Sequence, residues 1–277
     1  MYVQKDGETT RTKVVTDNNE DTDAISTIVR NAEQGNGTSY YKVIAKTTDR
    51  SGNVSDEAVV GWFKVEEKGK PTVMLVQNNQ DTILSDSTLE ASLPKVTVYR
   101  GENATITVKA SDNTGKVQNL TITNLPTGLT PDNSNQASDT ATDATPLTKP
   151  TTGKVAKTET VGEKIVTVTV SDKSNPANTI TVQFKVDVKE QKDKYTPTAG
   201  TTVKVGNIGT ISQPDEDKIK NAVTVPALSE EAIRDGVTKK LKDNGRVTAK
   251  NGKNYVTVEV VYPDGSKDEV DVAVDEV

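Results

Sequence analysis

Cysteine and histidine are both absent from this 277-residue sequence. Without histidine the chain cannot form a Ser-His-Asp or Cys-His nucleophile system, and the usual zinc sites are excluded as well. A pair of carboxylates of the glycosidase type would need no histidine, but no acidic residue at a strand end accompanies an aromatic sugar platform. We therefore predict that the protein is not an enzyme.

Large apolar side chains are also scarce. Hydrophobic residues make up 32% of the chain and aromatic residues 4%, so each core must be thin and built mainly from Val, Ile, Leu and Ala. Several small β-sandwiches fit this composition better than one large enzyme core. No run approaches ~18 consecutive apolar residues, which predicts no membrane span. Neither a signal peptide nor a sorting tail is recognisable, so we expect an internal piece of a longer protein.

Charge is not clustered by sign. The 34 basic and 40 acidic residues alternate along the chain and leave a net charge of −6, whereas nucleic-acid binding needs clustered Lys and Arg. This pattern predicts a solvated surface and no nucleic-acid partner. Combined with the richness in Thr, Asn, Asp and Lys, a chain without thiols suits the exterior of a Gram-positive bacterium.

Two charged segments divide the chain. Residues 66–71 follow an alternating apolar strand at 59–65, and residues 189–194 follow another at 179–188. The C-terminal end has the same kind of strand at 269–274. Three modules that each close with a terminal strand predict a head-to-tail string and an elongated monomer.

The predicted fold class is mainly β, with tandem immunoglobulin-like β-sandwich modules and short helices in the first and third modules. The predicted boundaries are a partial module at 1–68, a β-sandwich at 70–190 and a mixed module at 195–277. In the first module, residues 38–48 read as a strand. A short helix capped by Asp21 or Thr22 would present an apolar stripe made of Ile25, Ile28, Val29 and Ala32.

The second module has the strongest period-two pattern, at 104–110 and 165–170. Residues 131–160 are instead rich in Ser, Thr, Asp, Pro and Asn. We interpret most of that range as a long polar insertion without a core of its own. In the third module, 214–217 and Ser229 suit helix N-termini, and 256–274 predicts a hairpin. The second of these helices would place Ala232, Ile233, Val237 and Leu241 on one face.

Residues 95–188 resemble the cadherin-like or immunoglobulin-like modules of bacterial surface proteins. The resemblance rests on Asn124-Leu125-Pro126-Thr127-Gly128-Leu129, on Val161-Gly162-Glu163 and on Val170-Ser171-Asp172. Residues 195–277 resemble the Rib domain of Gram-positive surface proteins, through Val258-Glu259-Val260-Val261-Tyr262-Pro263-Asp264-Gly265-Ser266 and Asp268-Glu269-Val270. Together these resemblances imply an extracellular, cell-wall-anchored adhesin.

Calcium is the one cofactor that the sequence raises. In a sandwich of this topology, the loops carrying Asp112 and Asp172 lie at the end that faces the preceding module, and the connecting segment brings Glu66 and Glu67 there. Calcium takes six to eight oxygen ligands, so these four acids predict a partial site at the junction. The alternative is that Asp and Asn are simply good turn formers.

Ligand recognition is the remaining question. Trp62 is the single tryptophan and a candidate sugar contact, with Phe63 on the opposite face of the same strand. The 131–160 segment is a second candidate, because functional loops lie on rigid scaffolds. We expect a stalk that projects a binding region from the cell. The alternatives are that the modules themselves bind a host glycan or matrix protein, or that they belong to a secreted glycan hydrolase.

Overall fold

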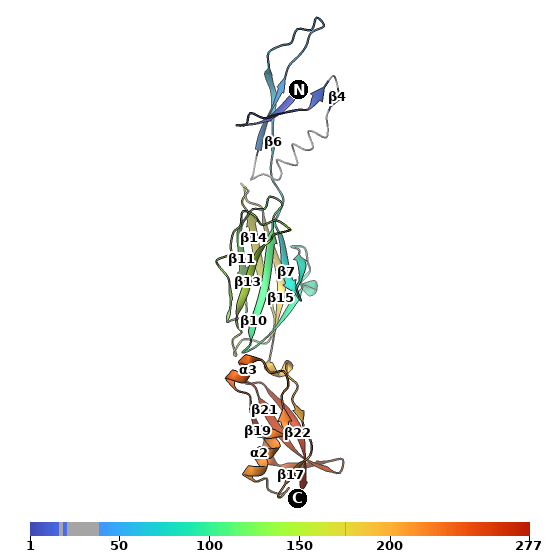
Figure 1. Ribbon diagram of the computed structural model, residues 1–277, viewed down its shortest axis with the longest axis vertical. Coiled ribbons are helices and arrows are strands. Elements are labelled where there is room, and N and C mark those ends of the chain that lie inside the picture. Colours follow the sequence, from blue (N-terminus) through green and yellow to red (C-terminus); the bar gives the residue numbers. More distant parts are fainter. Residues whose placement is uncertain (17–18, 21–38, 175) are drawn as a thin grey trace.

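The computed structural model describes residues 1–16, 19–20, 39–174 and 176–277. Three bodies follow one another along a single long axis, with the two ends of the chain at opposite ends of the molecule (Figure 1). The predicted fold class is confirmed, since the chain is mainly β and forms several sheets. No helix in the described ranges is long and apolar enough to cross a membrane.

In the described residues, the main sheet of the N-terminal body has the order β2-β1-β5-β6. Its core is small, because Tyr41 stacks on Phe63 at 5.2 Å between ring centroids and few other apolar side chains join them. The helix predicted in this body lies outside the described residues. The strands are β1 (Tyr2–Lys5), β2 (Arg11–Lys13), β5 (Ser39–Ala45) and β6 (Ala58–Val65), and β3 (Val15–Thr16) pairs separately with β4 (Asn19–Glu20).

The second body is a β-sandwich. One sheet has the order β12-β13-β10-β7-β8 and the other β11-β14-β15-β9, in which β9 runs parallel to β15. Alternate residues of both sheets point inward and form one continuous apolar core, which includes the fully buried Phe184. The strands are β7 (Thr72–Gln77), β8 (Gln80–Leu84), β9 (Lys95–Tyr99), β10 (Asn103–Ser111), β11 (Val117–Thr123), β12 (Leu129–Pro131), β13 (Leu147–Lys154), β14 (Gly162–Asp172) and β15 (Thr179–Lys189), with a short helix η1 (Glu90–Ser92).

The prediction of a long insertion at 131–160 is wrong for its second half, because β13 occupies 147–154 and pairs with β10 along eight positions. The inward-facing side chains of β13 are Lys149 and Thr151. Both are polar, so the sequence shows no alternation of apolar and polar residues along this strand. Lys149 is 1% exposed, and its Nζ donates a hydrogen bond to the carbonyl of Leu120 on the opposite sheet at 2.9 Å. Its aliphatic stem takes the place of an apolar residue in this core.

The third body packs two helices against a sheet of order β17-β22-β21-β19, and β20 also pairs with β21. Ser212 caps the first helix and Ser229 the second, which confirms the predicted helix starts. The second helix is shorter than predicted, because residues from Thr238 onward pair with β21. The elements are β16 (Thr198–Ala199), β17 (Val203–Val205), α2 (Gln213–Asn221), β18 (Val223–Thr224), α3 (Glu230–Asp235), β19 (Thr238–Leu241), η3 (Lys242–Gly245), β20 (Val247–Lys250), β21 (Lys253–Val261) and β22 (Lys267–Glu276).

A short helix, η2 (Gln191–Asp193), joins the second and third bodies. Gln191 is fully buried. Its backbone N–H donates to Oδ2 of Asp264 at 3.0 Å, and the backbone N–H of Asp264 donates to Oε1 of Gln191 at 2.9 Å. Across the same junction, Lys154 and Lys157 both pair with Asp235, at 2.6 and 3.0 Å. These contacts fix the connection at several points, so the two bodies adjoin through a specific interface.

Candidate functional site

The end of the sandwich that faces the N-terminal body gathers buried acidic side chains. Glu67 is 5% exposed, Asp112 is 4% exposed and Asp172 is fully buried. Asn178 bridges two of them, since its Nδ2 contacts Oδ2 of Asp172 at 2.8 Å and also Oε2 of Glu67. Asn113 donates to Oε1 of Glu67 at 3.2 Å. The connecting segment is therefore fastened to this end of the sandwich.

Neutral donors satisfy most of these carboxylate oxygens. Burial by itself would raise the pKa of Asp172, but hydrogen bonds from Asn178 and Ser174 outweigh it and lower that pKa. Ser174 also donates to Oε2 of Glu67 at 2.8 Å. The exception is Asp112, whose Oδ2 is buried and has no hydrogen-bond partner among the described residues. This oxygen is the free acceptor of the junction.

Glu66 does not join this group. It is ion-paired with Lys64 at 2.6 Å and with Lys68 at 3.4 Å on the surface. In the part of the chain that the structure describes, no three or more acidic side chains are arranged so that they could hold a metal ion. The turn-forming role predicted as the alternative is visible at Asp112 and Asp172, each of which accepts from a backbone N–H two residues on. Calcium at this junction stays a prediction.

Trp62 lies on the outer face of β6 and is 58% exposed, whereas Phe63 packs into the core. The expectation that Phe63 lies on the opposite face of the strand from Trp62 is therefore confirmed. The paired strands β5 and β6 carry three further apolar side chains that are at least half exposed, namely Tyr40, Val59 and Val60. The role of Trp62 as a ligand contact stays a prediction.

The loop between β12 and β13 lies along the outer edge of β11. Residue Ser138 forms a bridge with Val117, and the backbone N–H of Leu120 donates to the carbonyl of Gln136 at 2.9 Å. Lys173 pairs with Asp139 of this loop at 2.6 Å. The part of the 131–160 segment that is not strand is therefore held in a defined position on the sandwich.

Lys116 lies beside this loop and is half-buried. Its backbone carbonyl accepts from the N–H of Lys173 at 3.2 Å, but its ammonium group has neither an ion pair nor a hydrogen bond among the described residues. The hydrogen bond from Lys173 lowers the pKa of Asp139, and the charge of Lys116 lowers it further. Two lysines thus converge on one exposed carboxylate at the loop end of the sandwich.

Other cations of the sandwich are already engaged. Arg100 is its single arginine between residues 72 and 190, and it lies at the opposite end, where its Nε donates to the carbonyl of Glu159 at 2.5 Å. Lys95, Lys109, Lys154, Lys157, Lys164, Lys185 and Lys189 each face a carboxylate within 4 Å. An anionic ligand would therefore find its most available cation at Lys116. Sequence reasoning missed this residue, because pairing among surface charges is not visible in a sequence.

Two protein families match the chain. Residues 84–194 match the GspA/SrpA SigLec-like domain, and residues 191–275 match the Rib domain. The Rib prediction from the C-terminal hairpin is thereby confirmed. For the sandwich, the SigLec-like match is more specific than the cadherin-like or immunoglobulin-like resemblance seen in the sequence.

The chain is similar to a matrix-binding protein in sequence and to two bacterial adhesins in structure. The extracellular matrix-binding protein EbhB of Staphylococcus aureus (strain Newman) is 35% identical over 191 residues, which are 64% of this chain and 2% of that protein. Among solved structures, the SrpA adhesin from Streptococcus sanguinis has a TM-score of 0.54 at 19% identity and covers 74% of this chain and 94% of its own. The sialic acid binding region of a Streptococcus sanguinis SK1 adhesin, bound to 3'sLn, has a TM-score of 0.51 at 24% identity, with 75% and 48% covered. At such identities the structural likeness shows the fold.

Proposed function

Because this chain is a region of a bacterial surface adhesin in which a SigLec-like domain precedes a Rib domain, we propose that it binds a sialylated glycan of the host through the SigLec-like domain. The observation that carries the proposal is the match of residues 84–194. The sialic acid binding region of the Streptococcus sanguinis SK1 adhesin, which shares this fold, supports it. The binding alternative is thus better supported than a purely mechanical stalk.

The loop between β12 and β13, together with Lys116 and Lys173, is the proposed contact surface. A sialic acid carries a carboxylate at neutral pH and needs a cationic or N–H donor. The ammonium group of Lys116 has no partner among the described residues, and Lys173 can exchange its exposed partner Asp139 for the ligand carboxylate at little cost. The loop supplies hydroxyl and amide groups for the sugar hydroxyls, since Ser134 and Asn135 are both exposed.

The Rib domain would then act as a spacer, which retains part of the stalk interpretation. The three bodies are extended along one axis (Figure 1), and the SigLec-like and Rib domains are joined by specific contacts through Gln191 and Glu102. A cell-wall anchor elsewhere in the parent protein is part of this proposal. The matched proteins are adhesins and matrix-binding proteins, which agrees with a non-enzymatic role.

A glycan array tests the proposal. The full chain is applied to sialylated glycans and to the same glycans after removal of the sialic acid, together with immobilised matrix proteins. Binding that disappears with the sialic acid supports the proposal. Binding to matrix proteins alone would favour the other ligand class, and absence of binding to both would return the chain to the stalk interpretation.

A calcium ion at the first junction is a separate part of the proposal. Its support is that Asp112 has a buried carboxylate oxygen without a hydrogen-bond partner in the described structure, close in the chain to Asn113, which binds Glu67. A calcium ion would satisfy this oxygen and stiffen the connection to the N-terminal body.

A further inference from the structure

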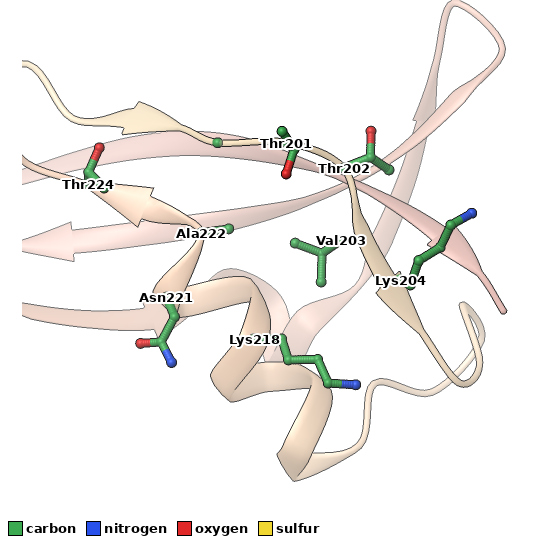
Figure 2. Close-up of a pocket in the computed structure, with 9 residues that line it drawn as sticks. Thr201, Thr202, Val203, Lys204, Lys218, Asn221, Ala222 and Thr224 are labelled. Carbon is green, nitrogen blue, oxygen red and sulfur yellow. The ribbon is translucent and has the colours of Figure 1, made fainter.

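The Rib domain contains a cavity that the spacer role does not use. It has a volume of about 720 Å³ and lies between the chain segment that leads into β17 and the C-terminal half of α2 (Figure 2). This volume is within the range of small-molecule sites. Its lining residues are Gly200, Thr201, Thr202, Val203, Lys204, Lys218, Asn221, Ala222 and Thr224.

The walls of this cavity are fixed by backbone contacts. The N–H of Gly200 donates to the carbonyl of Ala222 at 2.7 Å, and β16 pairs with β18 through Ala199 and Val223. Lys239 donates to the carbonyl of Val223 at 2.5 Å from the other side. The cavity therefore belongs to the folded domain and does not depend on the position of one side chain.

The lining combines an apolar floor with polar walls. Val203 is half-buried and packs against the core of the domain, and Figure 2 shows its side chain directed into the space between the segment and α2. Thr201, Thr202 and Asn221 are exposed, and their side chains have no hydrogen-bond partner within the described structure. Hydroxyl and amide groups both donate and accept, which suits the hydroxyls of a sugar.

Both charged lining residues are lysines. In Figure 2, Lys218 extends from α2 along the cavity, whereas Lys204 extends from the opposite face of β17, where it pairs with Asp275. Lys204 pairs with Asp275 at 3.2 Å and Lys218 with Asp215 at 2.8 Å, but each ammonium has three N–H donors. Both lysine side chains are more than half exposed, so donors remain for a ligand. No acidic residue lines the cavity.

We propose that this cavity binds an acidic saccharide. The anionic group, a carboxylate or a phosphate, would contact Lys218 at the edge of β17, while the sugar hydroxyls bond to Thr201 and Asn221 and the ring packs on Val203. The Rib domain would then be a second glycan-binding unit of the chain. This inference does not depend on binding by the SigLec-like domain, because the two surfaces share no residue.

Backbone amide NMR shifts of the full chain test the inference with three probes. A hyaluronan tetrasaccharide carries carboxylates, glucose 6-phosphate carries a phosphate, and maltotetraose is neutral. We expect an acidic probe to shift the amides of 200–204 and 218–224. A comparison of the shifts caused by hyaluronan and by glucose 6-phosphate tells which anion is preferred, and binding of either one supports the inference.

Variants separate this site from general attraction. The double change Lys204→Gln and Lys218→Gln should weaken binding about tenfold, whereas the double change to Arg should retain it. The control is Lys240→Gln with Lys250→Gln, which removes two exposed, ion-paired lysines elsewhere in the same domain. The inference is overturned if the Gln variant of the cavity binds like the wild type, if maltotetraose binds as well as the acidic probes, or if shifts occur only in 84–190.

Discussion

Tyr195 donates a hydrogen bond from its hydroxyl to Oε1 of Glu102 at 2.5 Å, and this contact joins the Rib domain to the sandwich. Glu102 is 3% exposed and also accepts from Gln191 at 2.9 Å and from Lys194 at 2.7 Å. Burial alone would raise the pKa of Glu102, but these donors outweigh it and lower the pKa. One carboxylate therefore organises the junction between the two domains.

Glu102→Ala should loosen this junction. The change leaves Lys194, Gln191 and Tyr195 with unsatisfied polar groups, at a cost of roughly 2 to 4 kcal/mol. Small-angle scattering should show a broader distribution of lengths, and the melting transition of the Rib domain should fall. Glu163→Ala is the matched control, since it removes an exposed carboxylate that also binds two lysines, Lys95 and Lys185. Equal effects of the two changes would refute the role of Glu102.

Gly128 should tolerate no side chain. Its φ is +95°, and a Cβ atom there would lie 2.0 Å from the carbonyl oxygen of Lys154. Gly128→Ala should therefore destabilise the sandwich by at least about 3 kcal/mol. Gly162→Ala is the control, because Gly162 also has a positive φ, +117°, but open space around it. Chemical denaturation measures both, and a similar loss in the two variants would show that the close approach to Lys154 is not important.

Glu159 should make the stability of the sandwich depend on pH. Burial alone would raise its pKa, but Lys164 and the backbone N–H of Thr127 outweigh it and lower the pKa to about 2. A depressed folded-state pKa stabilises the fold above the ordinary value of 4.5, and this contribution is lost as pH falls toward about 2. Glu159→Gln should therefore cost stability at neutral pH and little near pH 2. Chemical denaturation at several pH values measures the free energy of unfolding of both proteins. A difference between them that stays constant from neutral pH to about pH 2 would contradict the assignment.

Calcium should raise the melting temperature of the wild-type chain relative to a sample with chelator, if Asp112 binds the ion. The increase should be lost in Asp112→Asn, which removes one charge with almost no change in shape. Glu66→Gln is the control, because Glu66 lies outside the buried group. A wild-type melting curve that does not move between chelator and excess calcium removes this part of the proposal.

Period-two patterns predicted most of the strands. Strands β10, β14, β15, β21 and β22 bury Val, Ile and Phe at alternate positions, so burial and sequence agree. Strand β13 was missed, because Lys149 and Thr151 are its inward-facing residues and Pro150 interrupts the pattern. The polar side chain of Lys149 can be buried there only because the carbonyl of Leu120 accepts from it, a contact that depends on the tertiary fold.

The candidate sites could be predicted less completely. The sequence indicated that Asp112 and Asp172 lie at the junction end, because loop positions follow from strand order. It grouped Glu66 with Glu67, whereas in the structure Glu67 is buried and Glu66 pairs with Lys64 and Lys68, since a sequence cannot tell which of two adjacent acids turns inward. The availability of Lys116 and the cavity beside α2 depend on which ion pairs form and on how chain segments from distant positions meet.

The most direct test of the account is the affinity of the full chain for a sialylated trisaccharide and for the same sugar without sialic acid, measured by calorimetry. We predict binding of the sialylated form alone, and a weakening of about tenfold in Lys116→Gln with Lys173→Gln. The control Lys95→Gln, which changes an ion-paired lysine on β9 at the opposite edge of the sheet from β11, should bind normally. Equal affinity for both sugars, or no effect of the Lys116 and Lys173 changes, would contradict the proposed site.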